Sequence, residues 1–410
     1  MRSRWFKQSA TLAVRSVMRN HRRVALATSA VTFGIAALIM AGGFIEWIFW
    51  ATREGTIQQG LGHIHVAKEG FRDAGQATDS FLLPPDAPAL EALRERPGVR
   101  TVAPRRMFSG LVSHGDVTLS FFAEAVDPER ERNFGDVSII VRGEDLSGAK
   151  PHGVIIGQGL AANLDVNVGD TIVLLANKSN GGVNALEATV RGLFATVSKA
   201  YDDSAMRVPL PLADELLKRS GSHEWVMVLR RTEDTAPTVD ALRAAFRDKG
   251  FEFVPWYDIA DFYNKTVALL SRQMTVMEII IALIIVLTIG NSMMTGVMER
   301  TSEIGTAMAL GVHRRGVLLQ FVIEGLLLGI IGGVLGVTIG VVLAKLISAV
   351  GIPMPPPPGQ TREYRAGMIV TRELVLGSLA IAMTAALLAS VYPAWRASRI
   401  AIVDALRHNR

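Results

Sequence analysis

The chain has 410 residues, of which 49% are hydrophobic, and it carries a formal net charge of +5. It contains no cysteine, which excludes disulfides, thiolate metal sites and lipidation at cysteine. Its mean hydropathy of +0.30 is high for a soluble protein and directs attention to membrane-spanning segments.

Four long stretches contain no charged residue. Each has about 20 residues or slightly more, which as a helix spans the roughly 30 Å hydrocarbon core of a bilayer. One such stretch alone is compatible with a buried helix of a soluble protein, but four together predict a membrane protein. The stretches are Val24–Ile45, Ile279–Met298, Gly325–Ala344 and Leu374–Trp395.

Residues 1–23 form a flank with seven basic residues and no acid. This excess of positive charge places the N-terminus in the cytoplasm, either as an amphipathic helix on the membrane surface or as an ordinary basic flank. Because the flank adjoins a spanning helix, its charge does not indicate nucleic acid as a partner. The first transmembrane helix is expected over residues 24–50, as an uncleaved signal anchor.

Residues 51–265 are too many for a loop and are expected to form an α+β domain. Towards its two ends, residues 89–105 and 241–256 share a pattern: an amphipathic helix, a glycine and a short strand ending near a proline. This predicts two βαβ-like segments packed around a β-rich subdomain at about 153–217. The predicted fold is an α-helical membrane protein with four transmembrane helices plus a large α+β periplasmic domain inserted between helices 1 and 2.

Alternation across the membrane assigns the rest of the chain. The arginines near the C-terminus agree with a cytoplasmic end. The segments are a stalk with the second transmembrane helix (266–298), a cytoplasmic coupling segment (299–316), the third helix (317–347), an outer proline-rich loop (348–372), the fourth helix (373–395) and a cytoplasmic tail (396–410).

The third predicted helix carries two sets of glycines at intervals of four residues, and this spacing places the members of each set on one face of the helix. Small residues at this spacing allow helix backbones to approach closely in lipid. The two sets are Gly325, Gly329 and Gly333, and Gly332, Gly336 and Gly340.

A short amphipathic helix is predicted within Thr301–His313. Its apolar surface would enter a groove of a soluble partner while charges fix the register; a surface turn without a partner is the alternative. Glu324, at the start of the third helix, is expected to pair with the basic flank or to lie at the interface. The expected coupling residues are Glu299, Arg300, Glu303, Ile304, Met308, Leu310 and Arg314.

No catalytic or metal-binding constellation is apparent, so none is predicted. His63 and His65 share one face of a predicted strand, but no cysteine or acidic ligand accompanies them in the pattern. The sequence given has no G-x-x-x-x-G-K-[ST], so we expect it to hold no cofactor and to depend on a partner for ATP hydrolysis.

Residues 298–340 resemble the signature of FtsX-like ABC permeases, a group that includes MacB-type and lipoprotein-releasing permeases. The segment 153–217 is similar to the MacB-type periplasmic core, and Tyr392–Arg407 to the C-terminal motif, except that Ala401 or Ile402 replaces a proline. The matching residues are Glu299, Arg300, Glu303, Ile304, Gly305, Ala309, Leu310, Gly311, Glu324, Gly325, Gly329, Gly332, Gly333, Gly336 and Gly340.

The resemblance implies the type VII ABC architecture. This comprises two permease copies or paralogues in the bacterial inner membrane, with both chain ends cytoplasmic, and a separate cytoplasmic ATPase that holds ATP and magnesium. In that family ATP-driven closure of the ATPases moves the outer domains, and the substrate is handled on the outer side.

Three functions remain open at this point. The missing ATP-binding motif favours extraction of lipoproteins or another lipid-anchored substrate, with a periplasmic carrier as partner. MacB-like efflux of peptides or drugs through an adaptor, and FtsX-like signalling to a cell-wall hydrolase, are the alternatives. For extraction, aromatic residues of the first helix would line the space for acyl chains; an ordinary aromatic belt is the other interpretation. They are Phe33, Phe44, Trp47, Phe49 and Trp50.

Overall fold

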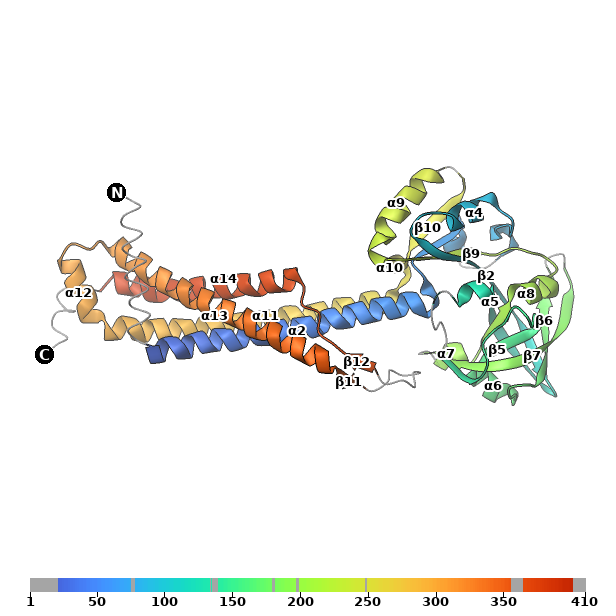
Figure 1. Cartoon of the computed structure of the whole chain (residues 1–410), viewed down its shortest axis with the longest axis horizontal. Coiled ribbons are helices and arrows are strands. Elements are labelled where there is room, and N and C mark those ends of the chain that lie inside the picture. Colours follow the sequence, from blue (N-terminus) through green and yellow to red (C-terminus); the bar gives the residue numbers. More distant parts are fainter. Residues whose placement is uncertain are drawn as a thin grey trace. The chain divides into compact units, whose positions relative to one another are not determined.

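The chain folds as two compact units in this computed structural model (Figure 1). We call residues 51–265 the inserted domain, and the unit that contains the long apolar helices the helical unit. Most of the predicted N-terminal flank, the prolines at 355–358 and the last ten residues lie outside the described part of the chain. The structure describes residues 21–74, 78–132, 134, 139–178, 181–196, 199–247, 249–354 and 364–400.

Four helices among the described residues are long and apolar enough to cross a membrane, which confirms the predicted architecture. They extend beyond the apolar stretches, because a helix continues through polar residues until a breaker or a turn ends it. The helices are α2 (His21–Thr56), α11 (Asp261–Glu299), α13 (Arg314–Val350) and α14 (Arg372–Ser398), with the short α12 (Thr301–Ala309) between α11 and α13.

Helix α13 packs closely against a different helix at each of its two sets of glycines. Gly325 and Gly329 lie against α14, where a Cβ at Gly329 would fall 2.5 Å from the Cβ of Ala386. Gly332, Gly336 and Gly340 lie against α2, where they face Val31, Ile35 and Ile39 respectively. The glycines therefore leave room for two neighbouring helices, which hold α2, α13 and α14 together as one packed layer.

Replacing Gly336 with alanine tests this packing. A Cβ there would lie 2.7 Å from both the carbonyl oxygen of Thr32 and the Cβ of Ile35, so α2 must shift. We expect Gly336→Ala to destabilise the helical unit by about 1–3 kcal/mol and to lower the melting temperature in detergent. Gly377→Ala in α14 is the matched control, because nothing lies within 4 Å of its Cβ. Equal melting temperatures for the two variants would contradict the packing.

The first part of the inserted domain comprises four strands, contributed by both ends of the domain, at one end of the ten-stranded sheet that the described residues form. Its strand order is β10-β1-β9-β2, and β1 is antiparallel to both β9 and β10. Each β-α-β segment therefore leaves a gap that the other fills, so the two segments interlock, which the sequence pattern does not specify. The elements are β1 (Ile64–Lys68), α4 (Pro88–Arg94), β2 (Val99–His114), β9 (Glu224–Leu229), α9 (Thr235–Ala245) and β10 (Phe251–Pro255).

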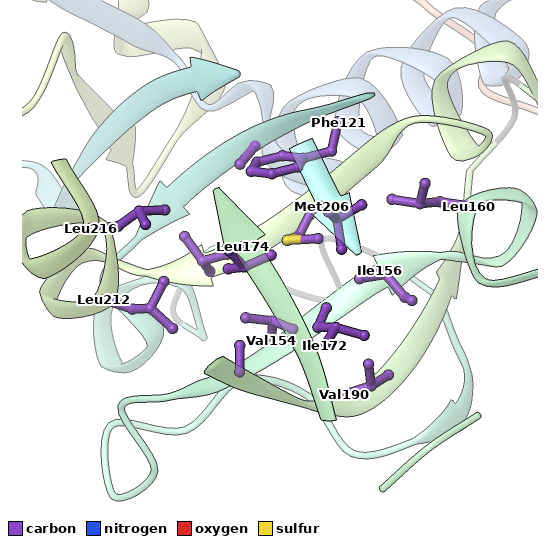
Figure 2. Close-up of a cluster of buried hydrophobic side chains, with 14 of the residues drawn as sticks. Phe121, Val154, Ile156, Leu160, Ile172, Leu174, Val190, Met206, Leu212 and Leu216 are labelled. Atoms are coloured by element: carbon purple, nitrogen blue, oxygen red, sulfur yellow. The ribbon is translucent and has the colours of Figure 1, made fainter. Parts of the chain in front are cut away.

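The second part is a β-rich body around the apolar core shown in Figure 2. Ile156, Ile172, Leu174 and Val190 are fully buried there. This body is larger than the predicted subdomain at 153–217, because it also contains β3, β4 and the second half of β2. Its elements are β3 (Val117–Val126), β4 (Ile139–Gly143), β5 (Gly153–Gly157), α6 (Gln158–Leu164), β6 (Thr171–Asn177), β7 (Val183–Ala195), β8 (Ala205–Pro209) and α8 (Leu210–Leu217).

Short elements connect these parts. In the helical unit, β11 pairs with β12 where a proline-rich loop was predicted. The short elements are η1 (Ile57–Leu61, a π-helical turn), α3 (Phe71–Ala74), η2 (Asp79–Phe81), α5 (Pro128–Glu131), α7 (Lys199–Asp202), η3 (Thr232–Asp234), α10 (Trp256–Ile259), β11 (Ile352–Met354) and β12 (Tyr364–Ala366).

A buried charge network lies where β2 passes from the first four strands into the β-rich body. Arg105 on β2 donates two hydrogen bonds to Glu131, at 2.7 and 2.9 Å, and lies 3.2 Å from Glu124. Arg207 donates to the same Glu124 at 2.9 and 2.7 Å. Burial alone would raise the pKa of Glu124, but Arg207 and Arg105 outweigh it and lower that pKa to about 2.

Acid should destabilise the inserted domain in two steps. Burial, followed by the charge of a nearby arginine, lowers the pKa of His63 and of His223 to about 4. The unfolded chain therefore binds more protons below pH 6.5, and roughly 1–3 kcal/mol per histidine is lost as the pH falls from 6.5 to about 4. Glu124 adds a further loss as the pH falls from 4.5 to about 2.

The urea midpoint of the 410-residue chain, measured by proteolysis within residues 51–265 at pH 7, 5 and 3, checks this loss of stability. We expect the midpoint to fall at each step, and less between pH 7 and 5 in His63→Gln. A midpoint that stays constant from pH 7 to 5 would show that the two histidines are not held neutral by the fold.

Candidate coupling segment

Helix α12 and the turn that follows it connect the second and third long helices. Only Arg300 separates α11 from α12, and the N–H of Ile304 donates to the carbonyl oxygen of Arg300 at 3.0 Å. Gly311, with φ of +98°, ends the helix: its N–H bonds to Met308 and that of Val312 to Ala307, both at 3.1 Å. This is a Schellman motif, and it turns the chain sharply into α13.

The apolar face of α12 points into the helical unit. Ile304 and Met308 are each only 8% exposed and belong to the apolar core that α2, α11, α13 and α14 share. The prediction that these two side chains form the surface offered to a partner is therefore wrong. Amphipathic spacing shows that one face is apolar, but the unit's own long helices compete with an outside partner for that face.

The surface that α12 leaves open lies at its C-terminal end. Leu310 is 83% exposed and Val312 42% exposed, within the Schellman turn. Glu303 and Arg314, two of the predicted coupling residues, are exposed as well. Val312 and, at the start of α13, Leu318 were missed by the sequence analysis; the signal for Val312 was the glycine before it, which ends the helix and turns this residue outwards.

Arg300 faces inwards and contacts α13. Its Nη1 lies 3.6 Å from Oε1 of Glu324, and both side chains are nearly buried. Arg300, which was predicted to contact a partner, therefore has a contact inside the unit, and the pair fastens the start of α12 to α13. Glu324 was expected to pair with the basic N-terminal flank; its partner among the described residues is Arg300.

The five aromatic residues of α2 do not form one lining. Phe33 and Trp50 are 75% and 47% exposed. Phe44 and Trp47 stack on each other with ring centroids 6.3 Å apart and are half-buried. Phe49 follows Phe44 by five residues, which places it about 140° around the helix, on another face. Phe33 and Trp50 are the two of the set with large exposed surface.

The C-terminal helices and the inserted domain match two known protein families. Residues 275–402 match the FtsX-like permease C-terminal family, and residues 24–245 match the MacB-like periplasmic core domain. The second match covers more than half of the 410 residues. The chain belongs to the FtsX-like permeases with a MacB-like periplasmic core domain. It is therefore an ABC transporter permease and a membrane protein, as the resemblance implied.

Two relatives and one solved structure are similar to parts of this chain. The macrolide export ATP-binding/permease protein MacB of Rhodospirillum rubrum is 27% identical over 377 residues, 86% of this chain and 55% of that protein. The lipoprotein-releasing system transmembrane protein LolC of Xylella fastidiosa is 26% identical over 323 residues, 74% of this chain and 73% of that protein. The solved periplasmic region of MacB from Actinobacillus actinomycetemcomitans covers 51% of this permease and 95% of that chain, with 13% identity and a TM-score of 0.36. This permease spans little more than half the length of the Rhodospirillum protein.

At the C-terminal end of α12, a charge on the buried face and a charge on the exposed face should have different consequences. Met308→Asp buries a carboxylate in the core, so we expect a loss of several kcal/mol and a poor yield of folded protein. Leu310→Asp changes an exposed side chain and should leave the melting temperature within about 2 °C of the parent. Melting in detergent measures both; similar losses in the two variants would contradict the assigned orientation of α12.

Proposed function

We propose that this permease works with a cytoplasmic ATPase and uses ATP-driven movement to extract lipoproteins, or another lipid-anchored substrate, from the bacterial inner membrane. The N-terminus, the α12 turn and the C-terminal tail would face the cytoplasm, and the inserted domain the outer side. ATP and magnesium would be held by the ATPase, and a second copy or paralogue of the permease would complete the transporter.

The exposed turn after α12 is the observation that carries the coupling proposal. Leu310 and Val312 are exposed apolar side chains, and charged residues flank them: Glu303 on α12, and Arg314 and Arg315 on α13. An apolar anchor surrounded by charges of both signs suits docking into a groove of a soluble protein, because burial supplies affinity and the charges select the register. At the other end of the helix, the buried Arg300–Glu324 pair fastens the start of α12 to α13.

The proposed substrate class rests on α2. Phe33 and Trp50 expose large aromatic surfaces on an apolar helix, where acyl chains or a second permease copy would cover them. Extraction of a lipid anchor from the outer leaflet needs such an apolar surface open to the membrane. The kinship with LolC is compatible with this, as the printed name of that protein refers to lipoprotein release.

Export of a small molecule is the second candidate. It is favoured by the relative that covers 86% of this chain, whose name refers to macrolide export. In that case an adaptor, rather than a lipoprotein carrier, would bind the inserted domain.

Site-specific photo-crosslinking in cells separates these functions. A photoreactive phenylalanine analogue replaces Phe33 or Trp50, and Leu388, which is 67% exposed on α14, serves as the control position. Cells are fed an alkyne-tagged fatty acid, and the products are purified and identified by mass spectrometry. We expect acylated proteins at positions 33 and 50, and at most lipid at position 388.

Purification of the permease with its bound proteins from native membranes tests whether its coupling partner is an ATPase. An ATPase should accompany the parent and be reduced at least tenfold in Leu310→Asp, but not in the exposed inserted-domain control Val183→Asp. Absence of any ATPase from the parent would contradict the permease mechanism. Crosslinks to an adaptor and no acylated protein would favour export, and capture of a cell-wall hydrolase would favour signalling.

A further inference from the structure

The end of α2 is held in the inserted domain by a buried apolar cluster of Ile57, Trp256 and Ala260, which we call the apolar plug. The helix is followed by the π-helical turn Ile57–Leu61, and the N–H of Gly62 bonds back to the carbonyl oxygen of Ile57 at 2.9 Å. Ile57 is fully buried against Trp256 and Ala260, close to the start of α11. Single π-helical turns of this kind are frequent at functional sites.

A directed chain of hydrogen bonds runs from β9 to the last turn of α2. The N–H of Leu229 donates to Nδ1 of His63 at 3.1 Å, so that nitrogen carries no proton. Nε2 of His63 then carries the proton and donates to the hydroxyl oxygen of Thr232 at 3.1 Å. The Thr232 hydroxyl in turn donates to Oε1 of Glu54 at 2.9 Å. Each of these three hydrogen bonds has one donor and one acceptor, and together they fix the side chains of His63, Thr232 and Glu54.

The surroundings of His63 support this arrangement. Burial, and next the charge of Arg53, lower its pKa to about 4, so the imidazole is neutral at physiological pH. Arg53 itself lies 3.2 Å from Glu54 and 3.5 Å from Glu233, but it is about a quarter exposed, so these ion pairs add little. The hydrogen bonds through Thr232 therefore restrain the last turn of α2 more than the ion pairs of Arg53 do.

We propose that Glu54, Thr232 and His63 form a clamp through which movement of α2 is passed to the inserted domain. The three are positioning residues: they touch no substrate and act by holding the last turn of α2 to β1, β9 and η3. Without the clamp, only the π-helical turn and the apolar plug would hold the last turn of α2 in the domain, and α2 would turn more easily against it. The inference rests on the proposed ATP-driven function.

Thr232→Val removes the central hydroxyl while keeping nearly the same shape, and Thr232→Ser keeps the hydroxyl as the matched control. Because the chain has no cysteine, two spin labels can be attached at Leu26→Cys and Val183→Cys, both on exposed side chains. The distance between the labels is measured in nanodiscs with the full chain and its ATPase, first with ADP and then with ATP and vanadate.

We expect the nucleotide to shift the distance in the parent and in Thr232→Ser, and at least half of that shift to be lost in Thr232→Val. ATP hydrolysis and ATPase binding should be unchanged in all three, which a general folding defect would not allow. An equal shift in Thr232→Val would overturn the clamp. No shift in the parent would instead overturn the proposed function.

A second pair of variants covers the case in which Thr232→Val folds poorly. Glu54→Ala removes the acceptor at the end of the chain but favours the helix, and Glu54→Gln keeps an oxygen for the Thr232 hydroxyl. The clamp requires that the shift be reduced in the first and retained in the second. Retention of the full shift in Glu54→Ala would contradict it.

Discussion

Everything in the helical unit depends on how closely α13 approaches its neighbours. Inside a bilayer there is no hydrophobic gain when helices associate, so van der Waals contact must hold them together. Two sets of glycines along α13 let α2 and α14 lie against its backbone, with Ile35 facing Gly336 and Ala386 facing Gly329. A packed layer of this kind moves as a body, which is what a permease needs if a push at one end is to be felt along α2.

Much of the membrane part could be predicted from the sequence because its signals are local. An uncharged run of spanning length and a glycine every fourth residue each report a physical need of one helix. Which helix each glycine face meets was not predictable, since that depends on tertiary packing. The orientation of α12 was missed for the same reason: Ile304 and Met308 mark an apolar face, and the sequence cannot tell an internal partner from an external one.

The inserted domain shows a different limit. Its two βαβ-like ends were predicted from a shared helix-glycine-strand pattern, and they fill each other's gaps in one sheet. The buried ions were not predicted, because Arg105, Glu124 and Arg207 are far apart in sequence and only the pairing of β2, β3 and β8 brings them together. No metal site was predicted at His63 and His65, and the structure gives the two ring nitrogens of His63 the partners Leu229 and Thr232, which the sequence did not indicate.

The central claim is that nucleotide binding by a partner ATPase alters the turn after α12 and, along α2, the junction at Ile57–Leu61. Hydrogen exchange with mass spectrometry on the permease–ATPase complex in nanodiscs, with ADP and with a non-hydrolysable ATP analogue, tests it directly. The account predicts nucleotide-dependent exchange at Leu310–His313 and at Ile57–Leu61, with little change in the buried core around Ile172 and Val190. Changes confined to the ATPase, with none in either segment of the permease, would contradict it.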